Sequence, residues 1–317
     1  MSQAEIRNIS TPVPSAFETM TFPTYRSLLS LEPQPRHPEM GQTKLIQPVA
    51  IGAWWEGAPA GLLVAEIPTG NSGDAEMLSL SCAAAVRNRG LGMALVKKLE
   101  EVLAEKGVSR VHAVYMTGKP SIPFVERILS RCGWSAPSAR TLTVRFTPEE
   151  AAETPWFGRV RSLESDYQLF PWETLTQDER AEIARSHQES PWIAPGLEPW
   201  IHDGYGFEPA SSLGLRFRGE VVGWVINHRL SSDTVRFTCS FVKKPLGRRG
   251  RIMPVFIESI KRARDAGFRT CTFVTPVRFK TMISFIERRC ASWAGFVGET
   301  RGSTRSLKNE TVGFKHR

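Results

Sequence analysis

The same pattern of apolar residues and glycines occurs twice in the chain, the second copy about 160 positions after the first. Residues 52–66 read GAWWEGAPAGLLVAE and residues 214–228 read GLRFRGEVVGWVINH, each with glycines five and then four positions apart. Short apolar runs flank the central glycine in both stretches, and glycine permits tight turns. Each stretch is therefore predicted to form two short strands joined by a turn.

A longer amphipathic pattern follows in each copy. Residues 88–107 (NRGLGMALVKKLEEVLAEKG) and residues 248–267 (RRGRIMPVFIESIKRARDAG) both place helical periodicity between two glycines 17 positions apart. The first glycine lies where a loop enters the helix, and the second lies where a helix commonly ends. Apolar runs at 109–116 and 268–276 follow at once, and they predict strands.

The order of predicted elements remains the same in the two copies after these strands. Each has a further helical stretch, then a glycine followed by an aromatic residue, then a last strand. In the first copy these are residues 121–132, Gly133-Trp134 and 140–146 (RTLTVRF), and in the second they are residues 280–291, Gly295-Phe296 and 304–308 (TRSLK).

The repeat predicts an α/β protein of two duplicated domains, residues 1–147 and residues 157–312. The stretch TPEEAAETP (147–155) joins them. Each domain is expected to open with a strand and a helix; in the second domain residues 175–188 supply that helix. Thr176 can cap its start, with Glu179 three residues further on.

Composition agrees with a globular protein of two domains. The 317 residues are 41% hydrophobic and 23% charged, and no run approaches the roughly 18 apolar residues that a membrane helix needs. The N-terminus has no basic-then-apolar signal layout, so a cytoplasmic location is expected. The five cysteines are scattered and the six histidines lack ligand spacing, which predicts reduced thiols and no metal.

The net charge of +9 changes the list of partners to consider. Five of the basic residues lie in KKPLGRRGR, from Lys243 to Arg251. Such a run suits coenzyme phosphates, an acidic protein partner or nucleic acid, and it also suits a solvated basic loop. Nucleic acid is the weaker option because no aromatic residues are interleaved with the charges.

The most informative chemistry lies between residues 75 and 101. A strand runs to about Cys82, and Arg87-Asn-Arg-Gly90-Leu-Gly92 then opens the helix. Backbone N–H groups at a helix start, supported by the helix dipole, can hold an anion such as a pyrophosphate. Gly90 and Gly92 would allow close approach of that anion, where a Cβ would obstruct it. The competing interpretation is a loop that only turns the chain.

These residues resemble a known family. Arg87-x-x-Gly90-x-Gly92 is similar to the Q/R-x-x-G-x-G/A signature of the GNAT acetyltransferase superfamily, and the order of strands and helices up to Gly133-Trp134 is similar to its fold. The resemblance covers residues 1–147 well and 157–312 more loosely. It implies a tandem GNAT protein, in which each domain has a mixed, mostly antiparallel central sheet flanked by helices.

The resemblance also implies how acetyl-CoA would bind. The pyrophosphate would lie on the backbone of the loop, and the pantetheine arm would pair with the end of the preceding strand like an extra strand. The loop residues are Arg87, Asn88, Arg89, Gly90, Leu91 and Gly92, and the strand residues are Leu80, Ser81 and Cys82.

Glu76 is the candidate general base. It lies eleven positions before Arg87, the offset at which the histone-acetylating branch of the family has its glutamate. A carboxylate on a central strand near the acyl group could take a proton from an ammonium substrate, directly or through water. The competing interpretation is a solvated residue at a strand end, beside Asp74.

The candidate general acid departs from the family pattern. Many members have a tyrosine four residues before the glycine of the Gly-aromatic pair, and this chain has Leu129 there. Ser130 is the nearest hydroxyl and Cys132 the nearest thiol, and both also suit a structural role. Tyr115, on the preceding strand, is a further candidate acid.

The second copy departs further. Ile252 stands where the first copy has Gly92, and Arg236 stands where it has Glu76. The branched isoleucine would crowd a pyrophosphate, so the second copy is expected to have lost catalysis. Residues 191–209 correspond to a region that commonly shapes the acceptor pocket in this family. His202, Asp203 and Tyr205 are its candidate residues, against the alternative of a packed irregular loop.

The resemblance therefore implies an N-acetyltransferase that transfers an acetyl group from acetyl-CoA to a primary amine, with the chemistry in the first domain. The amine is a small molecule or a protein, and an acidic protein is a candidate partner at Lys243–Arg251. The rival hypothesis is a non-catalytic acyl-CoA-binding or scaffold protein, which the missing tyrosine and the altered second copy favour.

Overall fold

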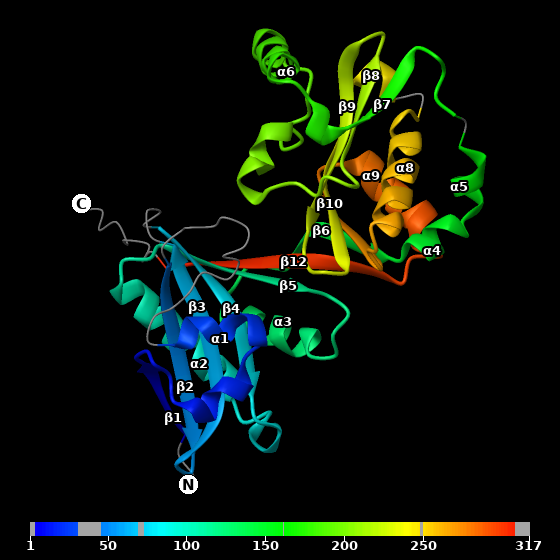
Figure 1. Cartoon of the computed structure of the whole chain (residues 1–317). Helices are drawn as coiled ribbons and strands as arrows, with labels where there is room; N and C mark the ends of the chain where they lie inside the picture. The colour runs from blue at the N-terminus through cyan, green and yellow to red at the C-terminus, as the bar shows by residue number, and fades with distance from the viewer. Residues whose placement is uncertain (1–3, 31–45, 69–72, 161, 248–249, 308–317) are drawn as a thin grey trace, which may run out of the picture. The chain divides into compact units, whose positions relative to one another are not determined.

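The structure is a computed structural model that describes residues 4–30, 46–68, 73–160, 162–247 and 250–307. The chain divides into two compact units (Figure 1). Unit 1 consists of residues up to Arg140 and residues from Glu299 onward, and unit 2 consists of Thr141–Gly298. Each has a mixed sheet flanked by helices, which confirms the predicted α/β class.

The sheet of unit 1 has one parallel pair, β4 with β5, among antiparallel neighbours. Its strands, in spatial order, are β1 (Ala4–Ile9), β2 (Ile46–Trp55), β3 (Ala58–Pro68), β4 (Asp74–Cys82), β5 (Arg110–Met116) and β12 (Phe296–Ser306). Its helices are α1 (Pro23–Arg26), α2 (Leu91–Glu105) and α3 (Ile122–Arg131), with 3₁₀ turns at Ser15–Met20, Ser27–Leu29 and Ala84–Val86.

The sheet of unit 2 repeats this plan, with β10 and β11 as the parallel pair. Its strands, in spatial order, are β6 (Ser138–Phe146), β11 (Thr270–Pro276), β10 (Thr234–Val242), β9 (Glu220–Arg229), β8 (Leu213–Phe217) and β7 (Tyr167–Pro171). Its helices are α4 (Pro148–Ala152), α5 (Pro155–Arg159), α6 (Gln177–Glu189), α7 (Lys244–Gly247), α8 (Ile252–Asp265) and α9 (Lys280–Phe285), with 3₁₀ turns at Trp172–Thr174 and Pro199–Tyr205 and a π-helix at Ile286–Cys290.

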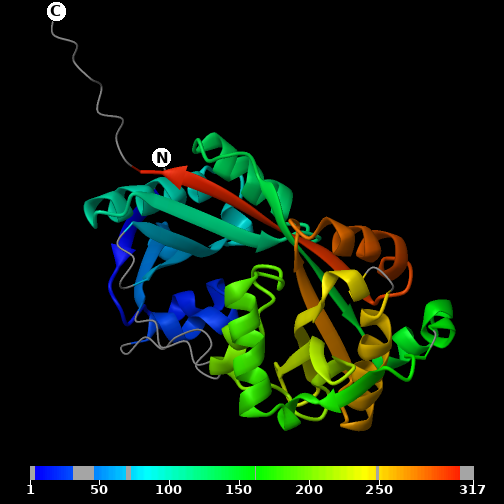
Figure 2. The same cartoon turned by 90° about the horizontal axis from the view of Figure 1, so that it is seen from above.

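Each unit completes its sheet with a strand from the other half of the sequence. In unit 1, β12 runs antiparallel beside β5, with Arg301 opposite Tyr115; Figure 2 shows the red strand along the green-blue one. In unit 2, β6 runs antiparallel beside β11, with Phe146 opposite Cys271. The boundaries 1–147 and 157–312 stay a prediction for the repeat, because the compact units exchange their last strands.

Two sequence predictions need correction. The joining stretch 147–155 forms packed helix: Thr147 accepts from the backbone N–H of Glu150, whose carboxylate accepts in return, and Pro148 and Ala151 are buried. Prolines and glutamates are typical of a linker, but here Pro148 and Glu150 belong to a capped helix start. The last strand is Phe296–Ser306, which begins eight residues before the predicted 304–308.

Apolar clusters lie on both faces of the sheet in unit 1. The α2-side core joins α2 and α3 to one face of β2–β5 and includes Ala75, Met77 and Leu129. The opposite core includes Phe17 and Leu78 and lies under the 3₁₀ turns and α1. Because successive strand residues point to opposite faces, these clusters show which way each residue of β4 points.

Candidate functional site

A β-bulge interrupts β4 near its middle. Val64 of β3 is opposite Ser79, but the next residue, Ala65, is opposite Met77, so Leu78 is the extra residue. Leu78 packs in the opposite core, and Ser79 Oγ lies 2.7 Å from the hydroxyl of Thr21 on the same side. The bulge thus changes the direction of β4 at this point.

Beyond the bulge β4 and β5 separate. They pair in parallel only from Asp74–Arg110 to Met77–Ala113, after which β4 continues beside β3 to Cys82 and β5 continues beside β12 to Met116. We call this separation the β4–β5 fork. Within the described residues, the edge of β4 that faces the fork has no strand partner after Met77. Its backbone groups can therefore pair with an extended ligand.

The predicted pantetheine residues Leu80, Ser81 and Cys82 all lie on this edge and are half-buried. On their other side they pair with Leu63, Leu62 and Gly61 of β3, respectively. Burial raises the pKa of the Cys82 thiol, and the nearby Arg87 only partly offsets this effect. Cys82 is therefore a neutral thiol at physiological pH and suits a binding wall better than a nucleophile.

The predicted pyrophosphate loop enters α2 as expected. Asn88, Arg89 and Gly90 are exposed, Gly90 has a φ of +83°, and α2 begins at Leu91. No side chain caps this helix start. The first backbone N–H groups of α2 consequently point away from the helix without intrahelical acceptors, in the arrangement that binds anions. Arg89 lies over the ring of Trp55, with 4.9 Å from its Cζ to the ring centroid.

The structure shows a packing reason for glycine at position 92. A Cβ at Gly92 would lie 2.7 Å from Cδ1 of Ile128, a side chain of α3. The absent Cβ therefore allows α2 and α3 to approach each other, which is a packing role. That this glycine also admits a phosphate stays a prediction. Gly92 contributes to the loop through its backbone.

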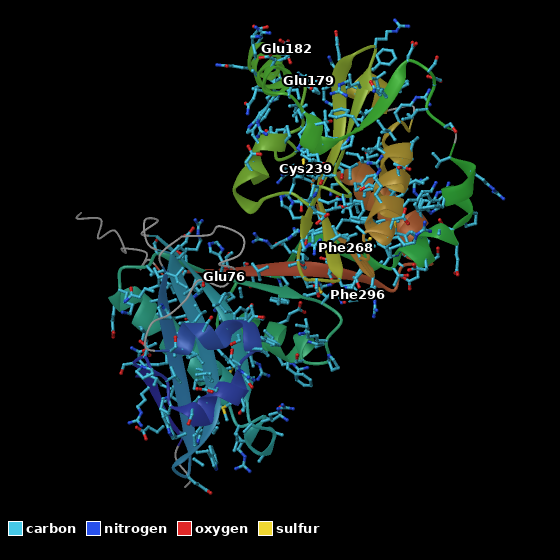
Figure 3. All side chains as sticks on the ribbon, in the orientation of Figure 1. Glu76, Glu179, Glu182, Cys239, Phe268 and Phe296 are labelled. Atoms are coloured by element: carbon cyan, nitrogen blue, oxygen red, sulfur yellow. The ribbon has the colours of Figure 1, made fainter. Side chains whose placement is uncertain are left out.

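Glu76 lies on β4 two residues before the bulge (Figure 3). Its neighbours Ala75 and Met77 belong to the α2-side core, so the half-buried Glu76 side chain lies on the opposite face. There it is opposite Glu66 on β3 and His112 on β5. Glu76 and His112 form the last pair but one before the fork.

Asp74 and His112 extend this polar row. Arg110 donates to both carboxylate oxygens of Asp74 at 3.0 and 3.1 Å, and His112 Nε2 lies 3.6 Å from the same carboxylate. The hydrogen bond from Arg110 holds the pKa of Asp74 below its usual value, with His112 as a smaller cause. His112 and Glu66 are not among the residues that the sequence pattern predicts for the site. If the pairing of β4 with β3 and β5 were known, the alternation of side chains along each strand would place both residues beside Glu76.

Ser130 is exposed and lies on α3, whose Leu129 is buried in the α2-side core. Glu76 lies on the other face of the sheet. Among the described residues, no contact joins the two predicted catalytic side chains. The roles of Glu76 and Ser130 stay predictions.

Tyr115, the other candidate acid, makes a side-chain hydrogen bond. Its hydroxyl donates to Glu126 Oε1 at 3.1 Å, and Arg301 Nη1 donates to the same oxygen at 3.1 Å. Burial, followed by the charge of Glu126, raises the pKa of Tyr115. The hydroxyl is therefore kept protonated on the β5 arm of the fork. Arg301 belongs to β12, so the second half of the sequence supplies part of this cluster.

The counterpart of the fork in unit 2 keeps its backbone and changes its side chains. β10 and β11 pair only over Thr234–Phe237 and Thr270–Phe273, and a register shift again marks an extra residue, Thr238. Arg236 and Ile252 replace the glutamate and the glycine. The duplication is thus visible in the bulge as well as in the element order.

Two residues of the basic run Lys243–Arg251, which precedes α8, make contacts within the protein. Arg251 pairs with Glu164, its side chain is only 13% exposed, and its guanidinium lies over Tyr167. Lys243 Nζ lies 5.2 Å from the centroid of the Trp192 ring. Arg248 and Arg249 lie outside the described residues. Docking of an acidic partner at Lys243–Arg251 stays a prediction.

The predicted acceptor residues in 191–209 can be placed only in part. Asp203, in the 3₁₀ turn Pro199–Tyr205, pairs with Arg180 of α6. The side chains of His202 and Tyr205 lie outside the described residues. No described group of three or more histidine, cysteine, aspartate or glutamate side chains could hold a metal ion. No helix in the described ranges is long and apolar enough to span a membrane.

Comparisons with known proteins match this description. The acetyltransferase (GNAT) family model matches residues 17–130. No curated protein matches the sequence. Among solved structures, a tandem GNAT protein from the clavulanic acid biosynthesis pathway is similar with a TM-score of 0.59 at 12% identity, over 96% of this chain and 99% of that one.

A GCN5-related N-acetyltransferase from Sphaerobacter thermophilus is similar with a TM-score of 0.60 at 15% identity, over 96% of each chain. At these identities the likeness concerns the fold, and the family match concerns the half that contains the fork. Residues 17–130 thus match the GNAT acetyltransferase family, and the chain as a whole shares the fold of these two solved structures.

Proposed function

We propose that the protein is an N-acetyltransferase that transfers the acetyl group of acetyl-CoA to a primary amine in unit 1. The β4–β5 fork is the observation that carries this proposal. It offers an unpaired strand edge at Leu80–Cys82 that leads to the uncapped start of α2. An extended arm that ends in a pyrophosphate would match both features.

In the proposed reaction the amine attacks the thioester carbonyl carbon, a C–N bond forms and the C–S bond breaks. Glu76 would accept the proton that the amine loses, directly or through water. Backbone N–H groups of β4 at the fork would stabilise the oxyanion. The leaving thiolate would take a proton from an acid on the α3 side, with Ser130 and Tyr115 as the candidates.

Calorimetry with acetyl-CoA is the first experiment. We expect one binding site per chain. The variant Asn88→Asp tests the loop, because it adds a negative charge at an exposed position that tolerates its φ of +61°. It should weaken binding roughly tenfold by repulsion of the pyrophosphate. Unchanged affinity in this variant would place the coenzyme elsewhere, and no binding at millimolar acetyl-CoA would contradict the proposal.

Turnover is tested by release of the CoA thiol with a panel of primary amines. Glu76→Gln should lower kcat by roughly a hundredfold, whereas the matched variant Glu105→Gln, at an exposed end of α2, should not. Ser130→Ala and Tyr115→Phe, compared by kcat, identify the acid. Coenzyme binding without turnover across the panel would favour the rival hypothesis of a non-catalytic acyl-CoA-binding protein.

A further inference from the structure

A second feature that could bind a ligand lies in unit 2, and its lining includes no residue of β10, the counterpart of β4. It is a cleft of about 510 Å³ between α5, the first turn of α8, and the segment formed by α9 and the π-helix. Trp156 and Trp293 form much of its wall, with Met253 contributed by α8. All of its lining residues belong to unit 2, and Figure 1 shows these helices grouped on one side of that sheet.

The two copies differ beside this cleft. In unit 1, Ile128 of α3 packs directly against Gly92 of α2. Unit 2 has Ile252 in place of that glycine, so α8 has a branched side chain at the position where α2 has none. The aromatic rings of Trp156, Phe285 and Trp293 line the cleft, with centroid distances of 6.3 Å from Trp156 to Phe285 and 5.9 Å to Trp293.

Three guanidinium groups line this apolar wall. Arg159 ends α5, and Arg288 and Arg289 belong to the π-helix; all three residues are exposed. None of them makes an ion pair with another described residue. Arg288 Nε donates to the backbone carbonyl of Ser284 at 3.2 Å, which leaves its terminal nitrogens available. The cleft thus presents several cationic donors without an anion to balance them.

Trp156 adds an independent sign of a missing acceptor. Its indole Nε1 is fully buried, and it has no hydrogen-bond partner among the described residues. Trp293, in contrast, donates its indole N–H to the carbonyl of Arg289. A buried donor without an acceptor is unfavourable, and native proteins seldom retain one. The π-helix beside it is also a rare element that occurs frequently at functional sites.

We propose that this cleft binds a small ligand that combines a flat apolar body with an oxyanion, such as an aromatic carboxylate or an aryl phosphate. The tryptophan and phenylalanine rings would contact the flat body. The guanidinium groups of Arg288 and Arg289, together with Arg159, would hold the oxyanion, and the Trp156 N–H would donate to a ligand acceptor. The proposal is independent of the acetyl transfer assigned to unit 1.

Equilibrium dialysis with coloured probes tests the proposal on the intact protein. 4-Nitrobenzoate and 4-nitrophenyl phosphate carry the two oxyanions, 4-nitrobenzyl alcohol is a neutral analogue, and inorganic phosphate lacks the ring. We expect at least one nitroaryl anion to bind roughly tenfold or more tightly than the alcohol. The preferred anion distinguishes a carboxylate ligand from a phosphate ligand. Inorganic phosphate should not displace it at equal concentration.

Variants locate the binding. The double variant Arg288→Gln/Arg289→Gln should weaken binding of the anion roughly tenfold, and Trp156→Phe, which keeps a ring and removes the N–H, roughly fivefold. Arg264→Gln, at an exposed position on α8 outside the cleft, should bind like the unaltered protein.

Three results would overturn the proposal: equal binding of the neutral alcohol, no effect of the arginine substitutions, or displacement of the probe by acetyl-CoA. The last result would make the cleft a second coenzyme site. The two exposed arginines can be replaced without loss of packing, so a failure to fold is not expected to obscure the outcome.

Discussion

Asn227 shows how a single residue fixes a loop in unit 2. Its side-chain amide donates to the carbonyl and the hydroxyl of Ser211, both at 3.0 Å, and to the hydroxyl of Ser259 at 2.9 Å. All three residues are fully buried. Because buried polar groups are costly without partners, this network holds the segment before β8 against α8.

We therefore expect Asn227→Leu to lower the free energy of unfolding by about 3 kcal/mol, since it strands several buried groups at once. Ser259→Ala should cost about 1 kcal/mol, because the carbonyl of Ser211 then loses one donor and keeps the amide of Asn227. Urea unfolding measures both. Equal effects of the two variants would contradict the central role given to Asn227.

Gly92 and Ile128 provide a second test at this scale. In the unaltered protein Ile128→Val should lower the free energy of unfolding by about 1 kcal/mol, because the methyl group that packs against Gly92 is lost. In a Gly92→Ala background the same change should cost almost nothing, because it removes the Cδ1 atom that the new Cβ would contact at 2.7 Å. Additive effects in a double-mutant cycle would contradict direct packing between these two positions.

At the scale of elements, α6 depends on charge more than on burial. Ile183 is its one buried residue, and Thr176 and Glu179 form a capping box at its start. Glu179 also pairs with Arg216 of β8 through two hydrogen bonds of 2.7 and 3.1 Å. The bond from Arg216 lowers the pKa of Glu179 below its ordinary value of 4.5.

A lowered pKa in the folded state has a defined consequence for stability. The contribution of Glu179 is complete above its unfolded pKa near 4.5 and is lost as the pH falls through the folded value. We expect Glu179→Gln, which retains the capping box, to reduce the loss of unfolding free energy between pH 5 and 3. Urea titrations across this range provide the measurement, and an unchanged pH slope would contradict the assignment.

Most elements were predictable from the sequence, because their apolar periodicity and end signals agree. The capping box at Thr176 and the helix between Gly90 and Gly107 are confirmed. The bulge at Leu78 was not predictable, since Leu78 and Ser79 look like ordinary strand residues and only the pairing with β3 reveals the extra position. The fork, and with it the most specific part of the candidate site, follows from that bulge.

The cluster around Tyr115 was beyond sequence reasoning for a different reason. Glu126 could be inferred from its place on a nearby helix, but Arg301 is 175 residues away from Glu126 in the sequence. Its position depends on the pairing of β12 with β5. The order of elements along the chain favours pairing of strands within one repeat. No residue in β5 or β12 indicates that each repeat exchanges its last strand with the other.

At the scale of the whole molecule, the exchange makes each unit dependent on both repeats. A fragment of residues 1–147 lacks the partner of β5 and leaves that edge open. We expect it to unfold without a cooperative transition. Residues 1–140 joined by a short glycine-serine linker to residues 299–307 contain the described parts of unit 1 and should unfold cooperatively.

Urea unfolding followed by circular dichroism compares the two fragments. A cooperative transition of the 1–147 fragment at the same urea concentration as the joined fragment would show that β12 is dispensable. The joined fragment should also keep any affinity for acetyl-CoA that the full chain has, because its fork is complete.

The exchanged strands also impose an order on biosynthesis. The ribosome makes Met116 at the end of β5 180 residues before it makes Phe296 at the start of β12. During that interval the first half of the nascent chain carries an open strand edge, which is a template for pairing with other chains. Translation speed and chaperone supply over these residues therefore bear on the yield of native protein. If the two repeats were made as separate chains, the edge of β5 would stay open until the two chains met.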